Sequence, residues 1–180
     1  MSVNDALPWI PQVLALIRQA VAQDIPVLGH CLGGQLMSKA LGGEVTRARV
    51  KEIGWGEVEV ADNSVAREWF APGTAFEAFH WHGETFSIPP GATRILSGAH
   101  CANQAFALGK HLGMQCHVEM TEELIRDWCR AGAHEIGEGR ASPGVQPAAK
   151  MEKNLAARVA ALHKVADRIY ERWSEALSKS

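Results

Sequence analysis

The sequence has little of three features that mark membrane or secreted proteins. Its apolar runs are much shorter than the roughly 20 residues that a helix needs to cross a bilayer. Residues 1–10 lack the basic region followed by an apolar core that is typical of a secretory signal peptide. The four cysteines, at positions 31, 101, 116 and 129, are too few and too widely spaced for a disulfide scaffold. We therefore expect reduced thiols, no membrane partner and a cytoplasmic location.

An excess of charge of one sign and the paired spacings of metal ligands are also missing. With 18 basic and 20 acidic residues the net charge is −2, so nothing indicates a nucleic-acid partner. No Cys-x-x-Cys or His-x-x-x-His pair occurs, and no glycine-rich phosphate loop of the P-loop type is present. The residues of types that can bind a metal ion are His80, His82, His100, Cys101, Cys116 and His117. Because they lack the paired spacings, the sequence predicts no metal and no cofactor.

What the chain does contain is an ordinary globular composition. Its 180 residues are 47% apolar and 21% charged, which suffices for one domain with a sizeable core. No internal repeat or low-complexity tract interrupts it. This composition is compatible with a small soluble molecule as the substrate.

The stretch 27–43 has the form of a nucleophile elbow. A cysteine, Cys31, stands between glycines after an apolar run and before a helix-compatible stretch, residues 35–41. Glycines are needed there because a sharp strand-to-helix turn leaves no room for side chains beside an exposed nucleophile. The N-terminus of the following helix would favour a thiolate. A lone cysteine is more commonly a buried structural residue, so a base and its orienting partner are required elsewhere.

Periodicity predicts the order helix, strand, elbow, helix, which is typical of an α/β fold. Apolar residues at spacings of three and four predict a helix over 8–23, and a short apolar strand follows at 25–28. The middle section is rich in strands, separated by turn signals at 54–56, 72–73 and 89–91. The expected strands are 44–46, 57–60, 75–81, 94–97, 105–108 and 114–117. A small basic cluster, Arg47, Arg49 and Lys51, is typical of a solvated loop.

The last third is expected to be helical at both ends. Thr121 is a candidate N-cap with two acidic residues in the following turn, so a helix should run to about residue 130. Residues 131–147 are rich in glycine, alanine and proline and predict a loop. An apolar stripe from Leu155 to Leu177 then predicts a long helix packed on the domain, with a dimerisation surface as the alternative. The predicted division is a domain over 1–135, a linker over 136–147 and the C-terminal helix within 148–180.

A base and an orienting carboxylate lie at the end of another strand-like run, residues 113–119. Alternation along a strand would place His117 and Glu119 on one face, roughly 6 to 7 Å apart along the chain. A carboxylate there could hold one imidazole nitrogen while the other faces a thiol. Together with Cys31 these residues would supply a nucleophile, a base and an orienting group.

The two motifs Gly29-His30-Cys31-Leu32-Gly33-Gly34-Gln35 and Gly113-Met114-Gln115-Cys116-His117-Val118-Glu119 resemble those of class I glutamine amidotransferases, in particular stand-alone members similar to the amidotransferase domain of GMP synthase. The resemblance covers roughly residues 5–130. It implies that Cys31, His117 and Glu119 are catalytic, that the backbone amide of Leu32 helps to form an oxyanion hole, and that Gln35 contacts the substrate. It also implies a three-layer, flavodoxin-like fold with a mainly parallel (mixed) sheet flanked by helices.

The sequence departs from the family pattern in three places. Cys116 and Val118 occupy positions where the family usually has phenylalanine and proline, which leaves the histidine and glutamate roles intact. No synthase domain is seen in these 180 residues, so a separate ammonia-accepting subunit is an expected partner. In the family, a strand, a helix and a further strand lead to a Gly-Gly-Pro-like loop that supplies a second oxyanion amide, and this loop precedes the part that resembles residues 1–5. The resemblance therefore leads us to expect that the domain over 1–135 is N-terminally incomplete and lacks this donor. Loss of one such donor typically lowers the rate about 100- to 1000-fold.

The resemblance thus predicts a hydrolase that cleaves a γ-glutamyl amide through a cysteine thioester to give glutamate and ammonia. A γ-glutamyl peptidase would use the same acyl chemistry on γ-glutamyl peptides. A non-catalytic regulatory subunit that binds a partner is the third interpretation. The first two interpretations share a small-molecule γ-glutamyl substrate, and under all three we expect no nucleic-acid and no membrane partner.

Overall fold

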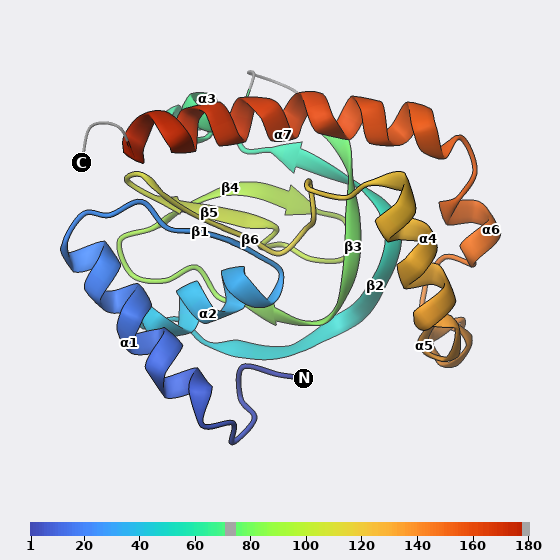
Figure 1. Ribbon diagram of the computed structural model, residues 1–180, viewed down its shortest axis with the longest axis horizontal. Helices are drawn as coiled ribbons and strands as arrows, with labels where there is room; N and C mark the ends of the chain where they lie inside the picture. The colour runs from blue at the N-terminus through green and yellow to red at the C-terminus, as the bar shows by residue number, and fades with distance from the viewer. Residues whose placement is uncertain (71–74, 178–180) are drawn as a thin grey trace.

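The computed structural model describes residues 1–70 and 75–177, and Figure 1 shows a curved sheet with helices on both sides. The turn signal expected at 72–73 lies outside the described residues. The helices are α1 Trp9–Ala22, α2 Leu32–Ala40, α3 Ser64–Trp69, α4 Glu122–Ala131, α5 Ala133–Gly139, α6 Ala148–Met151 and α7 Leu155–Leu177. The strands are β1 Leu28–His30, β2 Val45–Val60, β3 Ala75–Phe86, β4 Thr93–Gly98, β5 Ala105–Leu108 and β6 His111–Met114.

The six strands form one mixed sheet in the order β1-β6-β5-β4-β2-β3. Strand β1 pairs with β6 in parallel, and the other four strand pairs are antiparallel. The expected α/β sheet flanked by helices is confirmed, but its described pairs are mostly antiparallel rather than mainly parallel. The reason lies in the connections: β4, β5 and β6 follow one another through short turns, and short turns join antiparallel neighbours, whereas a parallel pair needs a long crossover.

Strand β2 is the main difference from the predicted elements. The sequence predicted two short strands separated by a turn at 54–56, whereas one strand runs through all 16 residues. Gly54, with φ +116°, lies inside the strand opposite His80. A Cβ atom at Gly54 would lie 2.6 Å from Gln146 Oε1, and that side chain pairs with the backbone of Trp55. The glycine therefore marks a close approach of another segment rather than the end of a strand.

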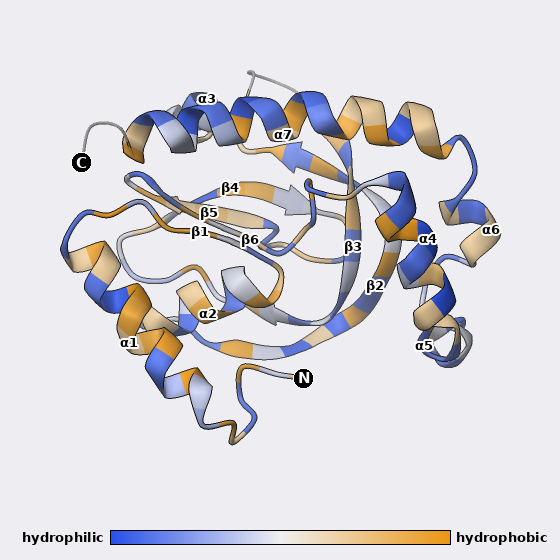
Figure 2. Cartoon of the chain, viewed as in Figure 1, coloured by the Kyte–Doolittle hydropathy of each residue, from blue (hydrophilic) through white to orange (hydrophobic). Residues whose placement is uncertain are grey.

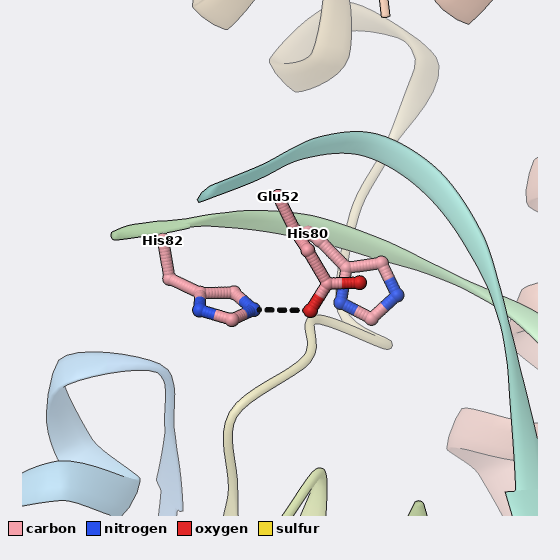
Figure 3. A group of neighbouring side chains, drawn as sticks. All are labelled: Glu52, His80 and His82. Atoms are coloured by element: carbon pink, nitrogen blue, oxygen red, sulfur yellow. Dashed lines mark ion pairs between the residues drawn. The ribbon is translucent and has the colours of Figure 1, made fainter. Parts of the chain in front are cut away.

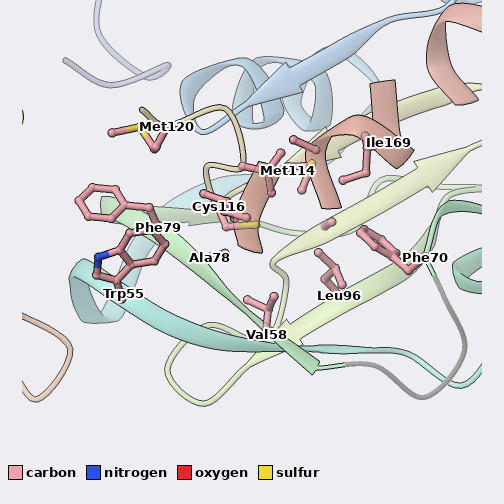
Figure 4. Close-up of a cluster of buried hydrophobic side chains, with 14 of the residues drawn as sticks. Trp55, Val58, Phe70, Ala78, Phe79, Leu96, Met114, Cys116, Met120 and Ile169 are labelled. Carbon is pink, nitrogen blue, oxygen red and sulfur yellow. The ribbon is translucent and has the colours of Figure 1, made fainter. Parts of the chain in front are cut away.

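Side chains of the sheet contribute to two apolar clusters, one on each face. On β5, Phe106 belongs to the cluster with α1 and α2, while its neighbours Ala105 and Ala107 belong to the cluster with α7. This alternation is the period of two of a strand buried on both faces. Figure 4 shows part of the larger cluster, where Trp55, Phe79 and Met114 lie with Ile169 of α7. The result is three layers, helix, sheet and helix.

Helix α7 carries the predicted apolar stripe. Its buried residues are Leu155, Val159, Leu162, Ala166 and Ile169. Figure 2 shows hydrophilic residues between the hydrophobic ones along α7 and α1, as expected for helices with one buried side. No helix in the described part of the chain is long and apolar enough to cross a membrane.

Two local expectations near α4 have opposite outcomes. The Thr121 hydroxyl accepts a hydrogen bond from the Leu124 amide at 3.1 Å, which confirms the predicted N-cap. The segment predicted as a loop instead contains helix α5, although it is rich in glycine. Tertiary contacts hold it: Glu135 pairs with Lys51 at 2.6 Å and accepts a hydrogen bond from the Trp81 indole at 2.9 Å. Such contacts outweigh weak helix propensity.

Candidate active site

Cys31 lies on the sharp turn between β1 and α2. Its backbone angles, φ +48° and ψ −107°, are strained for a residue with a side chain. The glycines on either side are required by close backbone contacts. A Cβ atom at Gly29 would lie 2.5 Å from the carbonyl carbon of Gly33, and one at Gly34 would lie 2.4 Å from the Met114 oxygen. Strand and helix can meet this closely only with glycine there, so the sulfur is presented at the start of α2.

His117 and Glu119 lie just beyond β6, not within a strand as predicted. Strand β6 ends at Met114, and His117 makes only an isolated bridge to Phe79, with backbone hydrogen bonds of 2.8 and 3.2 Å. This bridge fixes the backbone and brings the two side chains together. His117 Nδ1 lies 2.5 Å from Glu119 Oε1, so the carboxylate accepts the Nδ1 proton and leaves Nε2 as the outward nitrogen.

The pKa of the His117 imidazole is set by opposing influences. Burial alone would lower the pKa of its imidazole, but the adjacent Cys31 thiol and the Glu119 carboxylate together raise the pKa to about 9. His117 Nε2 is buried and makes no hydrogen bond within the described residues. Both Cys31 and His117 line one cavity of about 500 Å³. The nitrogen and the thiol therefore face one cavity, and no hydrogen bond joins them within the described residues.

Two glutamine side chains lie near the Cys31 sulfur and are hydrogen-bonded to each other. Gln115, fully buried, directs Nε2 toward Cys31 Sγ at 3.7 Å. Gln35 donates from Nε2 to the Glu84 carbonyl and to Gln115 Oε1, both at 3.2 Å. The sequence singled out Gln35 but gave Gln115 no role. Its position two residues before the histidine was the only available signal, because its partners lie 80 or more residues away.

Leu32 is the first residue of α2, so its amide has no partner within the helix. The first intrahelical bond to Cys31 comes from the Gln35 amide at 3.0 Å. An amide in this position, at the positive end of a helix, can donate to an oxygen that gains negative charge next to Cys31.

A second histidine and a tyrosine extend the site toward α7. His30 Nδ1 lies 3.5 Å from Glu119 Oε2, and His30 Nε2 lies 3.1 Å from the Tyr170 hydroxyl. Burial is the largest influence on His30 and lowers its pKa, which favours a neutral ring. A neutral ring can accept the tyrosine proton at Nε2 and present Nδ1–H to the carboxylate. Sequence reasoning missed both roles, because His30 and Tyr170 are 140 positions apart.

A larger cavity, of about 970 Å³, opens in front of Cys31, Leu32 and Gln35. Its charged lining residues are Asp5, Arg47, Arg49, Lys51, Glu84 and Glu135. The basic cluster interpreted as a solvated loop therefore lies on β2 and faces this cavity. Mixed charges of this kind suit a ligand that carries both a carboxylate and an ammonium group.

One group of side chains in the described residues has the proximity of metal ligands. Glu52, His80 and His82 each offer a donor atom, and these atoms lie within 4.8 Å of one another (Figure 3). Burial lowers the pKa of His80 to about 4. Burial would raise the pKa of Glu52, but the adjacent His82 ring and the charge of His80 outweigh burial and lower that pKa.

Comparison with known proteins gives a consistent result. The sequence matches the family model of glutamine amidotransferase class-I over residues 3–127. It is 29% identical over 138 residues to a glutamine amidotransferase-like protein, YfeJ, of Salmonella typhimurium, covering 76% of this chain and 58% of that protein. It is 35% identical over 98 residues to one subunit of the glutamine-hydrolyzing GMP synthase of Sulfurisphaera tokodaii, covering 53% of this chain and 51% of that one. The chain therefore spans little more than half the length of these relatives.

Solved structures agree over nearly the whole chain. The crystal structure of a glutamine amido transferase from Methylobacillus flagellatus matches with a TM-score of 0.95 and 48% identity, over 98% of this chain and 73% of that one. A glutamine amidotransferase from Thermotoga maritima matches with a TM-score of 0.83 and 30% identity, over 96% of this chain and 74% of that one.

Proposed function

Because the chain belongs to the class I glutamine amidotransferase family, we propose that it hydrolyses a γ-glutamyl amide through a thioester on Cys31. The products would be glutamate and ammonia. One observation carries the proposal: Cys31 shares a cavity with His117, and Glu119 holds the far nitrogen of that ring at 2.5 Å. A nucleophile, a base and an orienting carboxylate in this order are the elements of acyl transfer.

The proposed reaction begins with the Cys31 thiolate and a protonated His117. The sulfur attacks the amide carbon, and the carbonyl oxygen becomes an oxyanion that accepts a hydrogen bond from the Leu32 amide. His117 Nε2 then gives its proton to the leaving nitrogen, and ammonia departs from a glutamyl thioester. In the second half, neutral His117 takes a proton from water, the hydroxide attacks the thioester carbon, and glutamate leaves with Cys31 again a thiolate. Glu119 stabilises the imidazolium at both stages.

Substrate binding would use the large cavity in front of Cys31. Gln35, as the family resemblance implies, would contact the amino-acid end of the substrate. Its amide is positioned by the Glu84 carbonyl and by Gln115, so little side-chain freedom would be lost on binding. The acidic and basic residues around it can separate the ammonium from the carboxylate.

The direct test is glutamine hydrolysis by the purified chain and by Cys31→Ala, followed as glutamate release. We expect turnover by the unsubstituted chain and its loss in Cys31→Ala, since Cys31 is the cysteine that lines the cavity among the described residues. Cys101→Ala is the matched control, because Cys101 is a buried thiol outside the cavity and should leave turnover within about twofold. Activity that survives the Cys31 substitution would overturn the proposed nucleophile.

A γ-glutamyl peptide is the second candidate substrate, and the size and charge of the cavity favour it. At about 970 Å³ the cavity is at the upper end of the range for small-molecule sites and larger than glutamine alone needs. Arg47 and Arg49 line it, so they could receive the carboxylate of a departing amino acid. A lower KM for a γ-glutamyl dipeptide than for glutamine, lost in Arg49→Gln but not in Cys101→Ala, would identify a peptidase.

The acceptor of the ammonia would be a separate synthase subunit. One relative is named as a single subunit of GMP synthase, which supports a division of labour between chains. We further expect a reducing, cytoplasmic setting, because Cys31, Cys101, Cys116 and Cys129 are all free thiols.

A further inference from the structure

A compact buried cluster lies behind the cavity, on the two longest strands. Glu52 on β2 is paired in register with His82 on β3, and His80 lies two residues before His82. Directly opposite and alternate positions share one face of an antiparallel pair, so all three side chains converge. Each is almost fully buried, with exposed fractions of 6% for Glu52, 2% for His80 and 5% for His82. Figure 3 shows both rings beside the carboxylate.

The His82 ring meets the carboxylate in an unfavourable way unless a cation lies between them. His82 Nδ1 is 3.0 Å from the Glu84 carbonyl oxygen, which can only accept, so Nδ1 carries a proton. In the neutral ring this leaves a lone pair on Nε2. That atom is 3.0 Å from Glu52 Oε2 and makes no hydrogen bond within the described residues. Two lone pairs at this distance repel, and either a proton or a metal ion would remove the repulsion.

His80 presents a second unpartnered donor atom to the same place. Its Nε2 atom is 3.4 Å from the Gly56 carbonyl oxygen, so this nitrogen carries the ring proton. The other nitrogen, Nδ1, is buried and has no hydrogen-bond partner within the described residues. One proton could satisfy His82 and Glu52 but would leave His80 Nδ1 unpaired, whereas a metal ion would use all three donors.

We propose that Glu52, His80 and His82 bind one divalent transition-metal ion, for which zinc fits the donor set. Two imidazole nitrogens and one carboxylate oxygen are common zinc ligands. Donors about 2.1 Å from zinc lie roughly 3.4 Å apart in a tetrahedron. The three atoms here lie within 4.8 Å of one another, so an inward movement of about 1 Å or less would complete the site.

The surroundings meet two further requirements of a metal site. Each ligand has an outer partner: the Glu84 carbonyl for His82, the Gly56 carbonyl for His80, and the Gln104 amide, at 3.0 Å, for Glu52. Such partners fix the orientation and tautomer of metal ligands. A cavity of about 310 Å³, lined by Glu52 and His80, gives an entry path and room for a water molecule as fourth ligand.

The ion would stabilise the segment that lines the catalytic cavity and would take no part in the proposed hydrolysis. The Glu84 carbonyl oxygen accepts from both Gln35 Nε2 and His82 Nδ1. A metal that fixes His82 would therefore fix this carbonyl and the glutamine beside it. Zinc binding does not require the proposed hydrolysis. It can therefore be tested in a chain that lacks the Cys31 thiol, because this thiol would otherwise compete for zinc.

The experiment is equilibrium dialysis of Cys31→Ser, stripped with a chelator, against Zn²⁺, with bound zinc measured by elemental analysis. We expect one zinc per chain and a higher melting temperature in its presence. Glu52→Gln and His80→Asn, made in the same background, should each weaken binding at least about 100-fold and abolish the thermal shift. His134→Asn is the matched control, because His134 is 86% exposed and outside the cluster, and it should bind as the parent does.

The outcomes separate the alternatives. Two variants on different strands are used so that one folding failure, detected by circular dichroism without metal, leaves the other informative. If both variants fail to fold, zinc stoichiometry and thermal shift of the parent decide. A parent chain that binds no zinc would overturn the proposal and leave a shared proton as the explanation for the contact between His82 and Glu52. Equal binding by the parent, Glu52→Gln and His80→Asn would also overturn it and indicate an adventitious ion only.

Discussion

At the scale of single residues, the His117 imidazole is set by two opposing influences. Burial disfavours its charged form, and the neighbouring thiol and carboxylate favour it strongly enough to raise the pKa from 6.5 to about 9. A histidine with a raised pKa holds its proton more tightly in the folded state. Its contribution to stability is therefore fully present below pH 6.5 and is lost as the pH rises through about 9.

The same titration predicts the pH dependence of activity. His117 must be protonated to release ammonia, so kcat/KM should fall on the alkaline side with a midpoint near pH 9. Glu119→Gln removes the carboxylate charge, so the midpoint should move to lower pH and kcat should fall roughly 10²- to 10⁴-fold. Initial rates from about pH 6 to about pH 10 measure both. Glu123→Gln, on α4, is the control and should keep the original profile. An unchanged midpoint in Glu119→Gln would contradict the assigned role of Glu119.

At the scale of elements, α7 does more than cover the sheet. Its buried stripe packs against the sheet, and one turn beyond Ala166 it brings Tyr170 to His30 of the elbow. This helix lies outside residues 3–127, the part that matches the family model. Tyr170 thus contacts His30, whose Nδ1 lies 3.5 Å from the carboxylate of Glu119, so we expect Tyr170 to act as a positioning residue.

Removal of the Tyr170 hydroxyl tests this connection. Tyr170→Phe loses one hydrogen bond, worth about 1 kcal/mol, while the ring can stay in place. We expect kcat to fall about 2- to 10-fold with little change in KM, and the alkaline midpoint to shift, because Glu119 would be less well oriented. Glu171→Gln, at the next and exposed position, should change neither. A Tyr170→Phe variant that loses only thermal stability would show that the helix acts on packing alone.

At the scale of the whole molecule, the distribution of burial decides which thiol can react. Cys31 is partly exposed, whereas Cys101, Cys116 and Cys129 are buried. Burial also raises the pKa of the thiols of Cys101 and Cys129, which disfavours their thiolates. Cys31 instead shares its cavity with an imidazole that is protonated at neutral pH.

Iodoacetamide should therefore modify Cys31 first near neutral pH. Peptide mapping by mass spectrometry over time would give the rate at each cysteine, and the other three serve as internal controls. His117→Gln should slow the reaction at Cys31, because the base that can accept the thiol proton is lost. Labelling of Cys101 or Cys129 as fast as Cys31 would instead favour a non-catalytic, partner-binding role for this chain.

The sequence by itself determined the features that depend on neighbours along the chain. The elbow around Cys31, the N-cap at Thr121 and the apolar stripe of α7 were all predicted, because a turn, a cap or one helix face is specified within a few residues. The family was also recognisable from two short motifs. The proximity of His117 to Glu119 followed from their spacing, although an irregular segment and not a strand brings them together.

Only the tertiary structure decided what segments far apart in the sequence do to one another. Helix α5 and the unbroken strand β2 exist because Lys51, Trp81 and Gln146 supply contacts that local composition does not contain. The absence of metal-ligand spacing excluded a site within one segment, but Glu52 reaches His80 and His82 from another strand. Strand pairing sets such distances, and the sheet's register is fixed by the packing of its two faces, which no single stretch of sequence encodes.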